Sequence, residues 1–231
     1  LFQAGASEAG RTFAARNAEA VFIQAPTVEA AARDTADIRA RAKTIGRAPE
    51  DIKFFQGLHF VVGSTEEEAK RKSDELDQWI DYDAQLSHMS GAVGIDFGHE
   101  DLDRPVGELK TEGVQSILGW IKDLVTDREP TLRDVAHYTS HNGRITGTPE
   151  QIADKLAAWQ KAGVDGINVV NAEIPGSYEE IVDHLLPVLR ERGLAQREYA
   201  EGTLRQKLFG RGDRLPETHP AAQYRRVAAQ A

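Results

Sequence analysis

The sequence predicts an α/β fold built from parallel βαβ units, and two observations lead to this fold class. First, four segments of strand length are almost continuously apolar, as in strands that are buried on both faces of a sheet. They lie at the start of the chain, at 20–24, at 53–62 and at the end of 147–171. Second, helical segments with N-cap signals separate them. Such units form either a small open sheet or one half of a (β/α)8 barrel.

The first unit begins with its strand already under way. An apolar start leads into a turn of small residues at 5–10, and a helix is expected at 11–18. After the second strand, Pro26 and Thr27 open a helix whose apolar side recurs with helical spacing to about Ile45. Gly46 is a typical residue to end it.

The third strand, 53–62, is rich in β-branched and aromatic residues. Thr65, followed by three glutamates, predicts the start of a helix that continues to about Tyr82. From 86 to 143 the alternation of strands and helices breaks, which indicates an insertion with a function or disorder. The apolar spacing in 113–127 favours ordered helix there, and another short helix is expected near 132–137.

The last unit lies in 147–171, where Thr148 and Pro149 start a helix that precedes the fourth strand. A closing helix is expected from Tyr178 to Arg192. We therefore expect one domain over 1–210, which contains the insertion 86–143, and an extended C-terminal tail over 211–231.

Composition limits the classes of partner. The chain has 231 residues, of which 40% are apolar, with 28 basic and 37 acidic side chains and a net charge of −9. This charge opposes attraction to nucleic acid or to an anionic membrane surface, so we expect a small-molecule partner. The lack of cysteine excludes disulfides and thiolate sites. No signal peptide or membrane-spanning run is recognisable, and we expect a cytoplasmic protein whose preceding portion lies elsewhere.

The turn at 5–10 is the first candidate site. Its glycines and small side chains leave the backbone accessible, and it opens a helix whose first N–H groups have no intrahelical partner. Together with the Ser7 hydroxyl, these groups can hold a phosphate. The alternative is an ordinary helix cap, because serine and glycine are common in turns that bind nothing.

Four blocks of sequence carry a family resemblance. They are QAGxSxxGRxFAAxxAExVF at 3–22, GLHFVVGSTEEEA at 57–69, LSHMSGAVGIDF at 86–97 and GTPEQIADKL at 147–156. In this order they resemble the flavin monooxygenases related to bacterial luciferase, and most closely the branch that contains nitrilotriacetate and dibenzothiophene-sulfone monooxygenases. The resemblance implies the C-terminal half of a (β/α)8 barrel, strands 5 to 8, with the helical insertion after strand 7.

The resemblance also implies a cofactor and partners. The cofactor would be reduced flavin mononucleotide (FMN), whose phosphate would lie on Ser7 and on the backbone at Ala6. A separate flavin reductase would supply the flavin, which would react with oxygen to oxidise a small organic substrate. The N-terminal half of the barrel would provide most contacts to the flavin ring, and we expect a homo-oligomer. The alternatives are a non-catalytic half-barrel that serves assembly, and an oxidoreductase that uses a deazaflavin.

His141 is the candidate catalytic residue, because it precedes the last βα unit and similar family members carry a histidine near this place. It could exchange a proton on the substrate side of the flavin; the alternative is a histidine in a surface loop. His137 is a weaker candidate, and His59 is expected to be a satisfied core group within its strand. His88 and His99 lie near acidic residues, but their spacing matches no metal motif, so we expect no metal site.

Overall fold

The computed structural model describes residues 1–5, 7–93, 96–97, 101–108, 119, 121–122 and 124–224. Within this part of the chain, a sheet of five strands forms the centre of the molecule, and every pairing in it is parallel. The strands are β1 (Phe2–Ala4), β2 (Ala20–Ile23), β3 (Lys53–Val62), β4 (Arg144–Gly147) and β5 (Gly166–Val170). The predicted α/β class with a parallel sheet is confirmed.

Four of the strands, β1, β2, β3 and β5, lie side by side in chain order. The fifth strand, β4, was not predicted. It pairs with the last four residues of β3, from His59 to Val62, along the edge that β2 leaves free beyond Gln56. β5 occupies the opposite edge, because it pairs with Phe55–His59.

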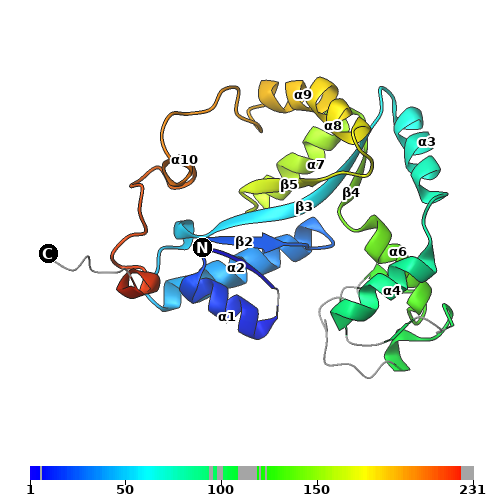
Figure 1. Cartoon of the computed structure of the whole chain (residues 1–231), viewed down its shortest axis with the longest axis horizontal. Coiled ribbons are helices and arrows are strands. Elements are labelled where there is room, and N and C mark those ends of the chain that lie inside the picture. The colour runs from blue at the N-terminus through cyan, green and yellow to red at the C-terminus, as the bar shows by residue number, and fades with distance from the viewer. Residues whose placement is uncertain are drawn as a thin grey trace, which may run out of the picture.

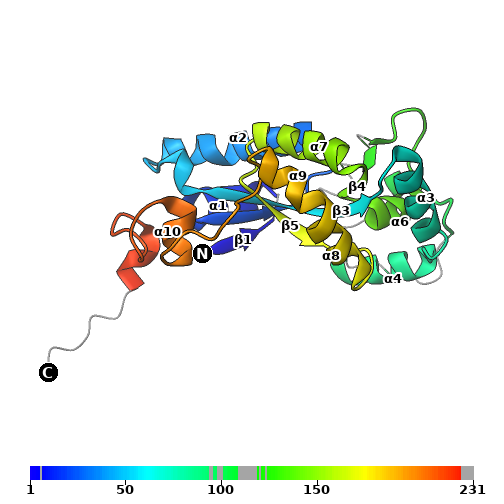
Figure 2. The same cartoon turned by 90° about the horizontal axis from the view of Figure 1, so that it is seen from above.

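Helices cover one face of this sheet (Figures 1 and 2). They are α1 (Glu8–Asn17), α2 (Val28–Thr44), α7 (Pro149–Lys161), α8 (Gly176–Glu180) and α9 (Leu186–Glu191), with a π-helical turn at Ile181–Leu185 between the last two. The N-terminal ends of α1, α2 and α7 are capped by the side chains of Ser7, Thr27 and Thr148, respectively. The side chains of β3 that face these helices belong to the main hydrophobic core; they are Phe54, Leu58, Phe60 and Val62.

The segment between β3 and β4 forms a second packed region, seen at the right of Figure 1. The helix that was expected from Glu66 to about Tyr82 ends earlier, at Asp77, as α3 (Glu66–Asp77), and α4 (Tyr82–Val93), which was not predicted, follows it. A 3-10 turn at Val106–Glu108 and α6 (Leu132–His141) follow. Leu86, Phe97, Leu132 and Val135 belong to a hydrophobic cluster separate from the main core. Most of the predicted helix at 113–127 lies outside the described residues.

The C-terminal segment returns to the start of the chain. It contains α10 (Leu204–Phe209), which was not predicted, and a 3-10 turn at Pro220–Tyr224 within the tail that was expected to be extended. Ion pairs join Arg205 to Glu19, and Arg211 to Asp51. None of the described helices is long and apolar enough to span a bilayer.

Candidate functional site

The turn between β1 and α1 is built around Ser7. The Ser7 side chain accepts a hydrogen bond from the Gly10 N–H at 3.1 Å, which makes Ser7 the N-cap of α1. Gly5 has a φ of 136°, a conformation that favours glycine. The N–H groups of Glu8 and Ala9 precede the first intrahelical donor, so they point out of the helix end. Ala6 lies outside the described residues.

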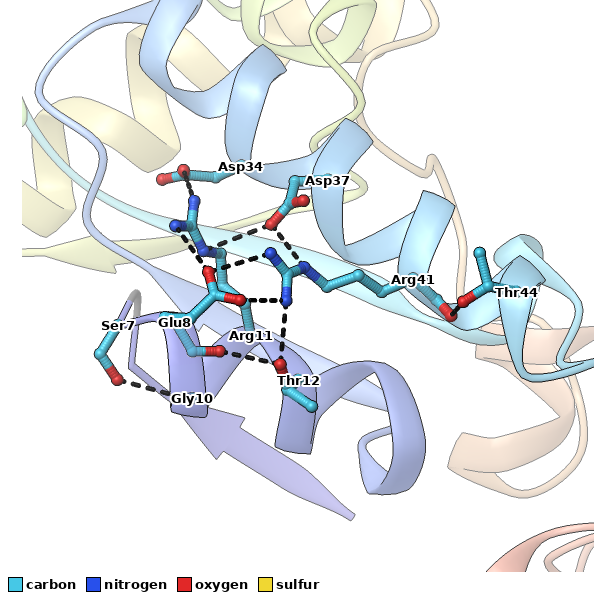
Figure 3. A network of polar contacts seen from close by, with 9 residues as sticks. All are labelled: Ser7, Glu8, Gly10, Arg11, Thr12, Asp34, Asp37, Arg41 and Thr44. Carbon is cyan, nitrogen blue, oxygen red and sulfur yellow. Dashed lines mark hydrogen bonds and ion pairs between the residues drawn. The ribbon is translucent and has the colours of Figure 1, made fainter.

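The carboxylate of Glu8 beside this turn is ion-paired within a network between α1 and α2 (Figure 3). Arg41 donates to both carboxylate oxygens of Glu8, at 2.6 and 3.0 Å, and also to Asp37. Arg11 pairs with Asp34 and Asp37. The hydrogen bonds from Arg41 hold the pKa of Glu8 below its usual value. Figure 3 shows the Glu8 carboxylate turned toward Arg41 and away from Ser7, so the anion of Glu8 does not occupy the helix end.

The uncovered face of the sheet carries a mixed aromatic and polar surface. We call it the inner face and define it by Phe22, Gln24, Phe55, His59 and Asn168. The register places Phe22 beside Phe55, and it places Asn168 beside Gly57. Neighbours in a parallel register point to the same side of a sheet. A Cβ on Gly57 would meet the Phe22 ring at 3.1 Å and the Gln24 amide at 3.6 Å, so these two side chains extend over Gly57.

His59 differs from its expected role as a satisfied core group. Its ring is half-buried, and it has no hydrogen-bond partner within the residues that the structure describes. Burial, followed by the positive charge of Arg144, lowers the pKa of His59. The ring is therefore neutral near pH 7, with one donor and one acceptor nitrogen.

His141 is the last residue of α6 rather than part of a loop. Its Nδ1 lies 2.9 Å from the carbonyl oxygen of His137, and its Nε2 lies 2.9 Å from Oδ1 of Asp77. The rings of His137 and His141 stack with their centroids 4.0 Å apart. Arg144 donates to the same oxygen of Asp77. Asp77 at the end of α3 thus joins α6 to β4, a contact that no local sequence pattern indicated.

Beside this cluster is a cavity of about 290 Å³. It lies where the main core meets the second hydrophobic cluster, since Leu58 and Trp159 line it from one side and Ile121 and Val125 from the other. His137, His141 and Arg144 supply polar groups to its wall. A mostly apolar cavity with a few convergent polar groups is typical of sites for small organic molecules.

Of the three predicted site residues, the two that the structure describes, Ser7 and His141, belong to different parts of the molecule. Ser7 begins α1, next to α2, whereas His141 ends α6, next to α4 (Figure 1). His88 is exposed on α4, and His99 lies outside the described residues. Within the described ranges, no group of three histidine or acidic side chains is placed to hold a metal ion.

Comparison with known proteins identifies the family. The sequence matches the luciferase-like monooxygenase family over residues 1–166. It is 39% identical to a dimethyl-sulfide monooxygenase of Hyphomicrobium sulfonivorans over 97% of the chain and 48% of that protein. It is 34% identical to a dibenzothiophene-sulfone monooxygenase of Rhodococcus erythropolis over 94% and 49%. It is 33% identical to nitrilotriacetate monooxygenase component A of Aminobacter aminovorans over 90% and 48%. The chain therefore spans about half the length of these relatives.

A solved structure agrees with this result. The crystal structure of a riboflavin lyase with modified FMN and riboflavin superposes on 98% of the chain and 51% of the lyase, with a TM-score of 0.80 and 34% identity. The family that the four sequence blocks resemble is thus confirmed by both sequence and fold. The chain belongs to the luciferase-like monooxygenase family.

Proposed function

We propose that the chain is the C-terminal half of an FMN-dependent monooxygenase barrel, in which β1, β2, β3 and β5 are strands 5 to 8. The observation that carries the proposal is the combination of family membership with an open sheet in chain order. The chain matches its relatives over about half of their length. The insertion after strand 7, 86–143, would then contain most of α4 and all of α6.

The edges of the sheet support a partner that supplies the remaining strands. Phe2 on the outermost strand β1 is 68% exposed, and Ile174, just after β5, is 77% exposed. Open strand edges with apolar side chains are normally paired or covered in soluble proteins. The N-terminal half of the barrel would cover both edges and the inner face between them.

The turn at Ser7 fits the phosphate of FMN. The outward N–H groups of Glu8 and Ala9, the Ser7 hydroxyl and the backbone near Ala6 would hold the phosphate at the positive end of the α1 dipole. The flavin, when bound, would supply the oxygen chemistry, while the barrel binds, orients and shields it. One relative is component A of nitrilotriacetate monooxygenase, and a component system supports a separate reductase as the source of reduced flavin.

We also propose His141 as the residue that exchanges a proton on the substrate side of the flavin. Its two ring nitrogens lie against oxygens of His137 and Asp77, so exchange with a substrate would require one of these contacts to open. The substrate would be a small organic molecule, and the cavity beside His141 is mostly apolar on the opposite wall.

FMN titration of the assembled barrel tests the phosphate site. By assembled barrel we mean this chain combined with the segment that supplies the first four strands. Ser7→Ala should weaken FMN binding about tenfold, measured by quenching of flavin fluorescence, because a charge-assisted hydrogen bond is lost. The matched control is Thr203→Ala, which also removes an N-cap, on α10. Equal FMN affinity in wild type and Ser7→Ala would refute the phosphate site.

A further inference from the structure

We infer that His59 is a flavin-facing residue, whose imidazole hydrogen-bonds the isoalloxazine ring from the inner face of the barrel. This inference rests on the proposed function, since it concerns the same flavin site. It adds a residue from the third strand to a site for which the sequence had indicated only the phosphate turn. Three independent features of the structure support it.

The first feature is the direction of the side chain. Along β3, the residues Phe54, Leu58, Phe60 and Val62 are packed in the core beneath the helices. His59 alternates with them, so it projects from the opposite face together with Phe55. The Phe55 ring contacts that of Phe2, whose side chain is largely exposed. His59 therefore points to the side where the barrel interior would form.

The second feature is the position of His59 along the strands. It lies beside Val170, the last residue of β5, and three residues beyond Gln56, which pairs with the last residue of β2. In (β/α)8 barrels, ligands bind at this carboxyl end of the strands. The Ser7 turn follows β1, two strands away, which corresponds to a lateral distance on the order of 10 Å. An extended ribityl chain can cover such a distance between phosphate and ring.

The third feature is the state of the imidazole. A neutral ring offers one N–H donor and one acceptor nitrogen, and the edge of an isoalloxazine ring presents both acceptors and an N–H donor. Neither nitrogen of His59 is engaged by another described residue, whereas both nitrogens of His141 already face acceptors. The side chains of Phe22 and Gln24 extend over Gly57, two residues before His59 on the same face, so an aromatic ring and an amide border the position of His59. The exposed amide of Asn168 lies beside Gly57 on this face.

Histidine NMR of the assembled barrel tests the inference directly. The His59 resonances are identified as those missing from a His59→Asn variant. Riboflavin and FMN should both shift them, because both contain the ring. Inorganic phosphate should leave them unchanged, because it occupies only the Ser7 turn. If riboflavin and FMN bind without moving the His59 resonances, His59 merely packs inside the barrel and the inference is wrong.

Affinity gives a second readout. His59→Asn should weaken riboflavin and FMN binding about 3- to 10-fold, the effect of one lost hydrogen bond. The matched control, His184→Asn, changes an exposed histidine on the turn after α8 and should leave affinity unchanged. Unchanged flavin affinity in His59→Asn would also overturn the inference. A wild-type barrel that binds no flavin at all would instead refute the proposed function, so the two failures are distinguishable.

Discussion

At the scale of single residues, Asp77 connects His141 on α6 to Arg144 on β4, two residues that sequence patterns did not relate to Asp77. Burial raises the pKa of this carboxyl group, but the hydrogen bonds from Arg144 and His141 outweigh burial, and the pKa lies below its ordinary value of 3.8. Arg144 also contributes to the lowered pKa of His59. Asp77 is therefore a positioning residue that orients His141 and holds the Arg144 guanidinium. Arg144 lies beside His59 in the sheet.

We predict that Asp77→Asn destabilises the chain by about 1 kcal/mol at pH 7, because charge-assisted hydrogen bonds to a partly exposed carboxylate are weakened. A lowered pKa stabilises the fold above the unfolded value near 3.8, and this contribution is lost as the pH falls through the folded value. Urea unfolding at pH 7 and pH 3 should show the difference between variant and wild type shrinking at pH 3.

The control for this prediction is Asp74→Asn, which changes an exposed carboxylate of α3 that pairs with Lys70. Exposed pairs of this kind contribute a few tenths of a kcal/mol. A loss of stability in Asp77→Asn that is as small as in Asp74→Asn would show that the cluster does not hold α3, α6 and β4 together.

The residue scale also shows what sequence patterns can and cannot predict about the site. Ser7 follows from a local pattern, a strand, a glycine turn and a cap, all within a few residues. The contact between Asp77 and His141 joins positions 64 residues apart, and no periodicity encodes it. His59 was predicted in the correct strand. Because its neighbours in the sequence are almost all apolar, no alternation indicated that its side chain projects from the uncovered face of the sheet.

At the scale of elements, the long helices and strands followed the predicted order, and the short strand β4 did not. Its four residues, RITG, are too few to show an alternation, and they form a strand because β3 extends beyond β2 and offers a free edge. The prediction also placed the end of α3 about five residues too late and did not include α4, whose residues have no clear helical apolar spacing.

Gly143, which enters β4, provides a test of that packing. Its φ is 76°, and a Cβ there would lie 2.7 Å from the carbonyl oxygen of Gly57. We predict that Gly143→Ala costs about 2–4 kcal/mol of unfolding free energy, from backbone strain and overpacking together. Chemical denaturation measures this cost.

Gly193→Ala is the matched control, since Gly193 has a similar φ of 71° with nothing within 4 Å of the added Cβ. It should lose only the backbone contribution, about 1 kcal/mol. Equal losses in the two variants would contradict the close approach of the β4 entry to β3.

The network between α1 and α2 makes a second prediction at this scale. Arg41→Gln frees the Glu8 carboxylate next to the phosphate turn, so FMN binding to the assembled barrel should weaken about 3- to 10-fold, by like-charge repulsion. Isothermal titration measures the affinity. Lys70→Gln, which breaks an exposed pair on α3, is the control and should bind FMN as wild type does. Undiminished affinity in Arg41→Gln would mean that Glu8 does not influence the turn.

At the scale of the whole molecule, the described chain is an open structure with two exposed edges. The helices bury one face of the sheet, while Phe2 on one edge strand and Ile174, just after the other edge strand, remain exposed. The family and the α/β class could be predicted because both depend on patterns repeated along the chain. The partner half could be inferred only as an expectation, because its residues are not in this sequence.

Flavin binding by separate and combined halves tests the central claim most directly. FMN is titrated into this chain, into the segment that supplies the first four strands, and into an equimolar mixture, with flavin fluorescence as the readout. We predict micromolar affinity for the mixture and at least tenfold weaker binding by either half, because this chain would hold the phosphate and one edge of the ring while the other half would provide most contacts to the ring. A mixture that binds FMN no better than its separate halves would contradict the account of this chain as half of a flavin barrel.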